Sequence, residues 1–404
     1  MFPKSFYELT TYRIGATLSY QILTVTAGWH IYEITHNVIS LGLIGLAEVI
    51  PYFLTALFSG YAVDHFSKKK LSILGVSVHL LIGIMMTLAI LGYFNILELE
   101  LSWFVYISMG LAGLARSLVR PTYLTIMTQI IDRNDLPRAN AFGSVMYQIA
   151  AISGPMIGGF LIAWLGLIFS YAASGLCALI GLIAIIYLRF EDVRNISSHS
   201  VFKSISEGLH FVFSKKVILS VLALDMFAVL FGGAISMLPA FISEILHGNP
   251  ENLGLLRAAP AIGSTAVGIW LTRHPVDKNA GKYLMLSVAF FGFSIMMFGL
   301  SNNFYVAAFF LFLTGIFDGI SVIIRNIIIV LSTPQSMQGR VSAINGLFVG
   351  SSNEIGSLES GFAASILGLA PSIIFGGAMT IFIVFGCYFS TPELKKLRVK
   401  DLHQ

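Results

Sequence analysis

A few ionisable side chains interrupt the long apolar stretches of this 404-residue chain. Ionisable groups inside membrane-spanning helices are costly, and they generally face the interior of a helix bundle or a water-filled cavity. Such groups can hold a charged solute or carry a proton. The candidates for substrate binding or coupling are Glu48, Arg116, Arg120, Asp225, Arg257, Asp318, Arg325 and Glu354.

Two of these arginines belong to one stripe. Arg116, Arg120 and Tyr123 are spaced so that they share a helix face, with Pro121 able to loosen the backbone beside them. Two guanidinium groups on one stripe in a low-dielectric span need an anion. That anion is either a partner carboxylate or a solute bearing carboxylate, phosphate or catecholate-like oxygens. The pattern favours an anionic or zwitterionic cargo.

Glu354 lies on a stripe of small residues. Gly350, Glu354, Ser357 and Gly361 recur at helical spacing, so Glu354 is expected to face protein. Because burial favours the protonated form of a carboxyl group, Glu354 is the first candidate for proton coupling. Glu359 lies about 140° away around the helix, and we expect it to contact a different neighbour.

Enzyme motifs are absent from the sequence. It contains no G-x-x-x-x-G-K-[ST] phosphate loop, and no Ser–His, paired-Asp or H-E-x-x-H arrangement stands out. The two cysteines, Cys177 and Cys387, lie in apolar runs and indicate neither a disulfide framework nor a metal site. We therefore expect no enzymatic activity, no cofactor and no metal. Any work done on a solute must draw on an existing gradient.

Twelve apolar segments would position these side chains. The chain is 56% hydrophobic and only 11% charged, which indicates an integral membrane protein. Each segment can cross about 30 Å of hydrocarbon as a helix. We predict an all-α membrane protein with spans at 12–34, 41–63, 71–94, 101–129, 139–164, 167–188, 217–246, 252–272, 282–300, 304–331, 341–367 and 370–390.

Basic residues predict the orientation of these spans. Three consecutive lysines, Lys68 to Lys70, follow the second span, and basic residues in a short loop mark the cytoplasmic side. None of the 24 lysines and arginines falls in the connections predicted outside, at 35–40, 95–101, 165–166, 247–251, 301–303 and 368–369. The pattern predicts a multi-pass protein of the cytoplasmic (inner) membrane with both termini in the cytoplasm. The net charge of +4 thus has a topological explanation and does not indicate nucleic-acid binding.

One long polar connection divides the chain. It separates an N-terminal bundle at 1–190 from a C-terminal bundle at 217–404, which ends in a short cytoplasmic tail, and the linker is 191–216. Weak internal identities support two similar halves. A shift of 209 residues places Pro51 on Pro260, and a shift of 202 places Gly113 on Gly315. We therefore predict twelve transmembrane helices in two pseudo-symmetric six-helix bundles, an arrangement found in many secondary transporters. We expect a monomer.

The same shifts relate residues of opposite charge. Glu48 maps onto Arg257, and Arg116 maps onto Asp318. We hypothesise that some of these groups pair across a central cavity in one conformation and part in the other.

The connection between the second and third spans carries a family signature, read as Gly, three residues, Asp, Arg, a spacer, Gly and two basic residues. His65 replaces its Arg and Ser67 its second Gly. The stretch resembles the signature of the major facilitator superfamily, and the resemblance implies that the Asp caps and charge-pairs with neighbouring helices to hold one end of the bundle shut. The residues at matching positions, which the resemblance assigns to gating, are Gly60, Asp64, Lys68 and Lys69.

A second stretch lies in the fifth span. It is similar to the helix-five motif of the exporter and antiporter branches of that superfamily, although Ala150 stands where the motif usually has an earlier Gly. Its motif residues are Gly154, Pro155, Gly158 and Gly159.

With the Arg138–Asn140 and Arg340–Gly361 stretches, the chain resembles the drug and siderophore exporter branch. The resemblance implies export of a small amphipathic or anionic compound by alternating access with proton antiport. Its expected partners are a small-molecule substrate, protons and the lipid bilayer. Two alternatives stay open: a proton-coupled importer of a siderophore or small organic anion, and a membrane scaffold or sensor that transports nothing.

Overall fold

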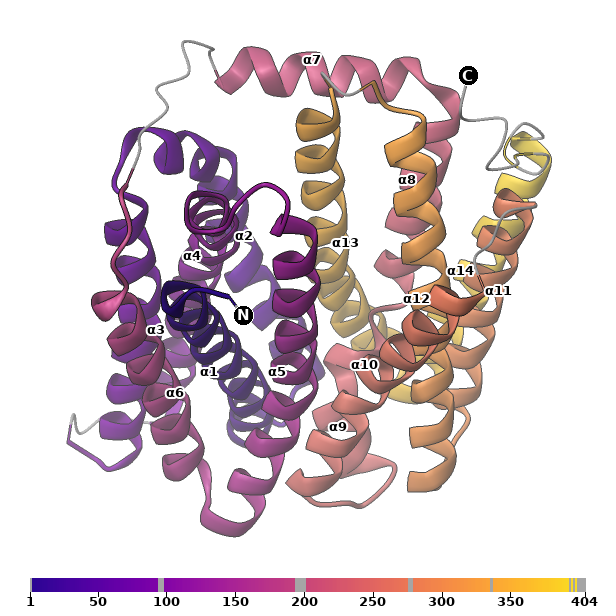
Figure 1. Ribbon diagram of the computed structural model, residues 1–404. Coiled ribbons are helices and arrows are strands. Elements are labelled where there is room, and N and C mark those ends of the chain that lie inside the picture. Colours follow the sequence, from indigo (N-terminus) through magenta and orange to yellow (C-terminus); the bar gives the residue numbers. More distant parts are fainter. Residues whose placement is uncertain are drawn as a thin grey trace. The chain divides into compact units, whose positions relative to one another are not determined.

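A computed structural model describes residues 2–93, 98–192, 201–274, 279–334, 337–391, 394 and 397 (Figure 1). Within these ranges every regular element is a helix, which confirms the predicted all-α class. The first helices are α1 (Lys4–Thr35), α2 (Val38–His65), α3 (Lys68–Ile90), α4 (Glu98–Ile130), α5 (Leu136–Leu165) and α6 (Leu167–Tyr187). The later ones are α7 (Val201–Ser214), α8 (Lys216–Phe231), η1 (Gly233–Met237), α9 (Leu238–Glu244), α10 (Pro250–Arg273), α11 (Ala280–Gly299), α12 (Phe304–Leu331), α13 (Gln338–Leu367) and α14 (Leu369–Ser390).

Ten helical segments of the described chain are long and apolar enough to cross a membrane, with α8, η1 and α9 counted as one. Helices α1 and α13 are 32 and 30 residues long, which also suffices for a crossing. Both carry more polar residues than the other ten.

The predicted span 217–246 is not one continuous helix. It is interrupted at Gly232 and Gly233, where a short 3₁₀ turn follows α8. A Cβ atom on Gly233 would lie 2.6 Å from the Gly356 carbonyl oxygen and 2.7 Å from the Ser360 hydroxyl. The absence of a side chain at Gly233 therefore lets α13 approach the interruption closely.

The polar linker contains a helix that hydropathy did not reveal. Helix α7 packs across the ends of α8, α12 and α13 (Figure 1). Its Val212 is fully buried in a cluster with Ile218 and Val341, and Arg340 forms an ion pair with Glu207 at 2.7 Å. A short amphipathic helix is easily missed among charges because only one of its faces is apolar.

The chain forms two compact units. Unit 1 comprises residues 1–198 and 248–258, and unit 2 comprises residues 199–247 and 259–404. The core of unit 1 includes Phe6, Tyr12 and Tyr123, whereas that of unit 2 includes buried side chains of α8, α11 and α12. Each unit is thus a helix bundle with its own packed interior.

Candidate functional site

Unit 1 contains a buried ion pair that joins three helices. Arg116 Nη1 of α4 lies 2.6 Å from Glu48 Oε1 of α2. The Tyr20 hydroxyl of α1 donates a hydrogen bond to the same carboxylate oxygen at 2.6 Å, and it accepts one from Arg116 Nη1. The Glu48 side chain is only 4% exposed, but that of Arg116 is 28% exposed. The carboxylate is therefore enclosed, whereas part of the Arg116 side chain remains exposed.

Aromatic rings complete this cluster. The guanidinium carbon of Arg116 lies 4.6 Å from the ring centre of Tyr52 and 5.2 Å from that of Tyr20. The buried ring of His79, on α3, meets Tyr20 edge to face at 6.2 Å. Cation–π contacts of this kind strengthen when water is excluded. The rings hold the arginine without neutralising it.

A glycine explains the close approach of α2 and α4. A Cβ atom on Gly113 would overlap the backbone carbonyl oxygen of Glu48. One turn earlier, a Cβ atom on Gly110 would lie 3.2 Å from the Ala47 carbonyl oxygen. Glycine at these positions brings the two backbones together, and that contact places Glu48 within reach of Arg116.

The partners differ from those that the internal repeat suggests. Glu48 and Arg116, which the repeat assigns to two different pairs, bind each other because α2 and α4 pack within one unit. The contacts of Glu48 with Arg257 and of Arg116 with Asp318 stay predictions for another conformation. The sequence analysis also missed Tyr20 and Tyr52. Only the helical spacing of Glu48 and Tyr52, four residues apart, could have drawn attention to one of them.

Unit 2 contains its own buried ion pair. Asp225 of α8 pairs with Arg325 of α12, and the two residues are 6% and 3% exposed. Both were candidates from the sequence. This pair joins the first and fourth long helices of its half, as the contact between Tyr20 and Arg116 does in unit 1.

The remaining candidates lie apart from these pairs. Arg120 is exposed on α4, and Arg257 is partly buried in α10. Asp318 is partly buried in α12 and has no hydrogen bond or ion pair within the described residues. Glu354 is a position of α13, and its side chain lies outside the described residues.

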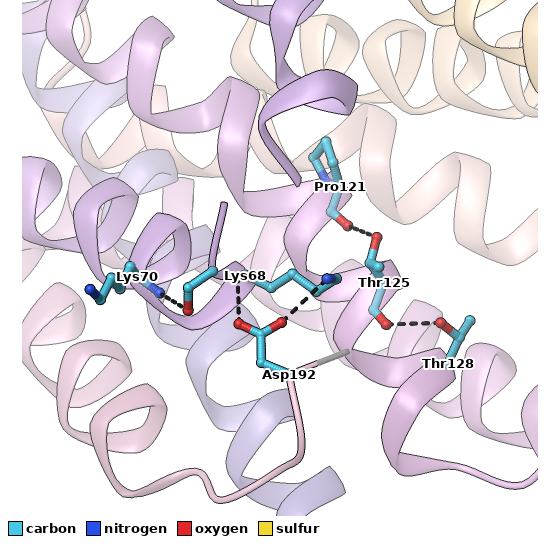
Figure 2. Close-up of polar contacts among 7 residues, drawn as sticks. Lys68, Lys70, Pro121, Thr125, Thr128 and Asp192 are labelled. Atoms are coloured by element: carbon cyan, nitrogen blue, oxygen red, sulfur yellow. Dashed lines mark hydrogen bonds and ion pairs between the residues drawn. The ribbon is translucent and has the colours of Figure 1, made fainter. Parts of the chain in front are cut away.

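Two of the four predicted gating residues tie α3 to the end of α6 and the residues that follow it. The Lys68 backbone N–H donates to Asp192 Oδ2 at 3.0 Å, and Lys68 Nζ lies 3.3 Å from Asp192 Oδ1 (Figure 2). Lys69 Nζ donates to the carbonyl oxygens of Ile186 and Leu188, both at 2.8 Å. A cation at the C-terminal end of a helix satisfies carbonyl groups that lack a helical partner. The side chains of the other two, Gly60 and Asp64, lie outside the described residues, and gating stays a prediction for all four.

Lys68 offers a clear test of this connection because its side chain is only 2% exposed. We expect Lys68→Met to lower the free energy of unfolding by about 1–2 kcal/mol, since a charge-assisted hydrogen bond to a carboxylate is lost. Thermal unfolding of the purified protein in detergent would measure the change. The exposed neighbour Lys70 supplies the control, Lys70→Met. Equal melting temperatures for the two variants would contradict the assignment.

The helix-five motif is a packing surface. A Cβ atom on Gly154 would lie 2.5 Å from Gln21 Cβ of α1, and one on Gly158 would lie 3.4 Å from Ile22 Cα. A Cβ atom on Gly159 would instead meet the first turns of α10, 2.6 Å from the Gly254 backbone nitrogen. The stripe thus fits two neighbouring helices through the absence of side chains.

Trp164 reinforces the same contact. Its indole Nε1–H donates to Glu251 Oε1 of α10 at 2.6 Å. We expect Gly159→Ala to lower stability by roughly 1–3 kcal/mol, because backbone atoms of α10 must shift to admit the methyl group. Gly386→Ala is the matched control, since a Cβ atom there would meet nothing within 4 Å. If melting curves in detergent show both variants to be as stable as the unmodified chain, the α5–α10 packing is not tight.

A polytopic helical protein with charges buried inside its bundles has the architecture of a secondary transporter. A family model for transmembrane secretion effectors matches residues 4–403, and the chain therefore belongs to this family of the major facilitator superfamily. It is a multi-pass membrane transporter of that superfamily and not an enzyme.

Relatives of known name are distant but match over most of their length. The staphyloferrin A transporter of Staphylococcus aureus is 23% identical, with 91% of each chain covered. The multidrug efflux pump Tap of Mycolicibacterium fortuitum is 22% identical, with 93% of each chain covered. The enterobactin exporter EntS of Citrobacter koseri is 24% identical, with 91% of this chain and 88% of the exporter covered.

Solved structures show the same fold. A D-xylose–proton symporter superposes with a TM-score of 0.75 at 12% identity, covering 97% of this chain and 99% of its own. A bacterial homologue of the human lysosomal transporter Spinster superposes with a TM-score of 0.73 at 15% identity, covering 97% of each chain. These likenesses establish the major facilitator fold predicted from the sequence.

Proposed function

We propose that this chain exports a small anionic or amphipathic compound across the cytoplasmic membrane by alternating access with proton antiport. The observation that carries the proposal is the combination of an enclosed Glu48 with a partly exposed Arg116. Glu48 and Tyr20 hold Arg116 in place, so its positive charge meets a solute at a fixed position. Arg120, exposed one turn further along α4, adds a second positive charge.

The direction of transport in this proposal rests on relatives. Two of the three named above are an efflux pump and an exporter, and the family model describes secretion. Iron chelators and drug-like compounds are therefore the substrate classes to examine first. Both termini are proposed to be cytoplasmic, and the chain is proposed to act as a monomer in the inner membrane.

Proton coupling requires a carboxylate that gains and loses a proton during the cycle. Glu354 is the first candidate because of its place on the small-residue stripe of α13. Asp318 is the second, because it is partly buried and has no hydrogen-bond or ion-pair partner within the described residues. Neutralising the carboxylate that carries the proton would uncouple transport from the proton gradient.

The alternative is proton-coupled uptake of a siderophore or small organic anion. The Glu48–Arg116 pair would serve either direction of transport, because an anionic solute can take the place of the Glu48 carboxylate beside Arg116. One of the three relatives, the staphyloferrin A transporter, is named without a direction.

The two directions can be separated by measurement. Extracts of cells with and without the gene would first be compared for retained organic anions and iron chelators, and for altered drug sensitivity. A compound that accumulates inside deletion cells would then be supplied to inverted membrane vesicles with an acidic lumen. Export predicts uptake into these vesicles together with a rise in lumenal pH, and vesicles from deletion cells are the control. If the compound moves only with protons in the same direction, the export proposal is wrong.

A further inference from the structure

A third arginine of unit 1 has no role in the ion pairs described above. Arg13 of α1 lies with its guanidinium carbon 4.3 Å from the ring centre of Tyr123 on α4 and 4.9 Å from that of Tyr147 on α5. Within the described part of the chain it forms one hydrogen bond, from Nη1 to the Gly143 carbonyl oxygen, which is long at 3.5 Å. Within the described residues no carboxylate forms an ion pair with Arg13. The side chain is thus a partly buried cation surrounded by rings.

Arg13 and Arg116 both lie along the contact between helices α1 and α4, which we call the track. Helices α1 and α4 contact each other at Arg13 with Tyr123 and at Tyr20 with Arg116. Arg13 and Tyr20 are seven residues apart along α1, and Tyr123 and Arg116 are seven residues apart in the opposite direction along α4. The two helices therefore run antiparallel. Seven residues are about two turns, or roughly 10 Å. Arg120 lies between the two contacts on the α4 side, so the track carries three arginines.

A hydroxyl group beside Arg13 has hydrogen-bonding capacity that the described residues do not use. We call Arg13, Tyr123, Gly143 and Tyr147 together the corner. The Tyr123 side chain is fully buried, and its hydroxyl has no hydrogen-bond partner among the described residues. A Cβ atom on Gly143 would overlap that hydroxyl and would lie 3.5 Å from Arg13 Nη1. Only glycine at position 143 therefore lets both polar groups lie so close to the backbone of α5. A buried hydroxyl without a partner costs free energy that a bound acceptor would recover.

The chemistry of the corner selects an oxyanion. Aromatic rings stack on the flat faces of a guanidinium and leave its N–H edges free, which is the geometry that binds a carboxylate through two hydrogen bonds. Tyr147 is 41% exposed, so a ligand can reach the corner. We propose that Arg13, Tyr123 and Tyr147 form an oxyanion-binding site, which takes the carboxylate of an organic anion that also carries a flat apolar group. The site deepens the proposed function and rests on it for its role in transport, because it lies about two turns from Arg116 on the same track.

Equilibrium binding tests the site without any gradient. The full-length protein in lipid nanodiscs would be titrated with benzoate, and with benzamide as its uncharged counterpart, by isothermal calorimetry. We expect benzoate to bind at least about tenfold more tightly than benzamide, since only the carboxylate can pair with the guanidinium. We expect Arg13→Gln to abolish that difference and Arg13→Lys to retain part of it, because a lysine keeps the charge without the two-pronged geometry.

Matched variants separate binding from folding. Arg133→Gln removes the same charge from an exposed position and should bind benzoate like the unmodified chain. Tyr147→Leu changes a partly exposed ring that folding can spare, and we expect a threefold to tenfold loss of benzoate affinity. The proposal is wrong if the unmodified protein does not distinguish benzoate from benzamide, or if both Arg13→Gln and Tyr147→Leu bind benzoate normally.

Failure of this site and failure of the proposed function give different results. If benzoate binding depends on Arg13 but inverted vesicles accumulate no compound, the site stands and the exporter proposal fails. If vesicles accumulate a compound equally well with Arg13→Gln and with the unmodified chain, the exporter stands and the site has no part in transport.

Discussion

Replacing Arg116 with methionine is expected to abolish transport and to lower the free energy of unfolding by about 3–5 kcal/mol, as when one partner of a buried ion pair is removed. The Glu48 carboxylate would stay enclosed, with the hydrogen bond from the Tyr20 hydroxyl in place of its ion pair. Transport would be measured in inverted vesicles, and stability by thermal unfolding in detergent. This range is an upper bound on the loss in free energy of unfolding, because Arg116 is 28% exposed and water screens part of its charge.

A double variant separates the two effects of Arg116. Glu48→Gln together with Arg116→Met leaves no charge in the pair, so we expect stability to recover by more than half. Transport should stay lost, because the reachable positive charge is still missing. Arg133→Met controls for the loss of one positive charge at an exposed position. If the double variant transports normally, the ion pair serves the fold and has no part in solute binding.

The second large effect is expected in unit 2, where Asp225→Leu should destabilise the protein by about 3–5 kcal/mol. Arg325 would then be an unpaired cation with 3% exposure, which is a more severe case than that of the partly exposed Arg116. Arg325→Met should have a similar effect from the opposite side. The combination Asp225→Leu with Arg325→Met should lie close to the unmodified protein, because apolar residues of similar volume replace a buried pair at little cost.

These four proteins form a double-mutant cycle, and melting curves in detergent would give the coupling between Asp225 and Arg325. Coupling well above 0.5 kcal/mol is expected for residues in contact. Additive effects of the two single changes would show that the pair does not form. Transport by the stable double variant would indicate whether the pair also works in the cycle. Normal transport would assign it to folding alone.

The two ion pairs differ in a way that bears on function. In unit 1 one member, Arg116, remains partly exposed, and two more arginines lie along the same track. In unit 2 both members are enclosed. The proposed contact of a solute with positive charge is therefore placed in the first half, where arginines outnumber their carboxylate partners along this track.

Particular residues show how far the sequence could lead. Glu48, Arg116, Asp225 and Arg325 were identified because a charge in an apolar span is conspicuous at any helix rotation. Their partners were not identified, since shifts between repeats describe equivalent positions and not contacts. Arg13 escaped attention because it lies at the first turn of the predicted span 12–34, where a basic residue looks like a topology signal.

Two features of local structure were also not predicted from the sequence. Helix α7 was missed because its apolar face is short and its other face is polar. The interruption at Gly232 and Gly233 was missed because hydropathy continues through it, and only the close approach of α13 explains why residue 233 is a glycine.

Hydropathy, basic residues and glycine motifs by themselves determined that this chain is an all-helical transporter of the major facilitator fold with charges inside its spans. Those properties are sums and patterns along the chain, so they do not depend on which helices are neighbours. Only the tertiary structure decided that Glu48 binds Arg116, that Asp225 binds Arg325 and that Arg13 lies against the rings of Tyr123 and Tyr147. Such choices depend on the rotation and register of packed helices, which are set by close contacts such as that of Gly113 with the backbone of Glu48.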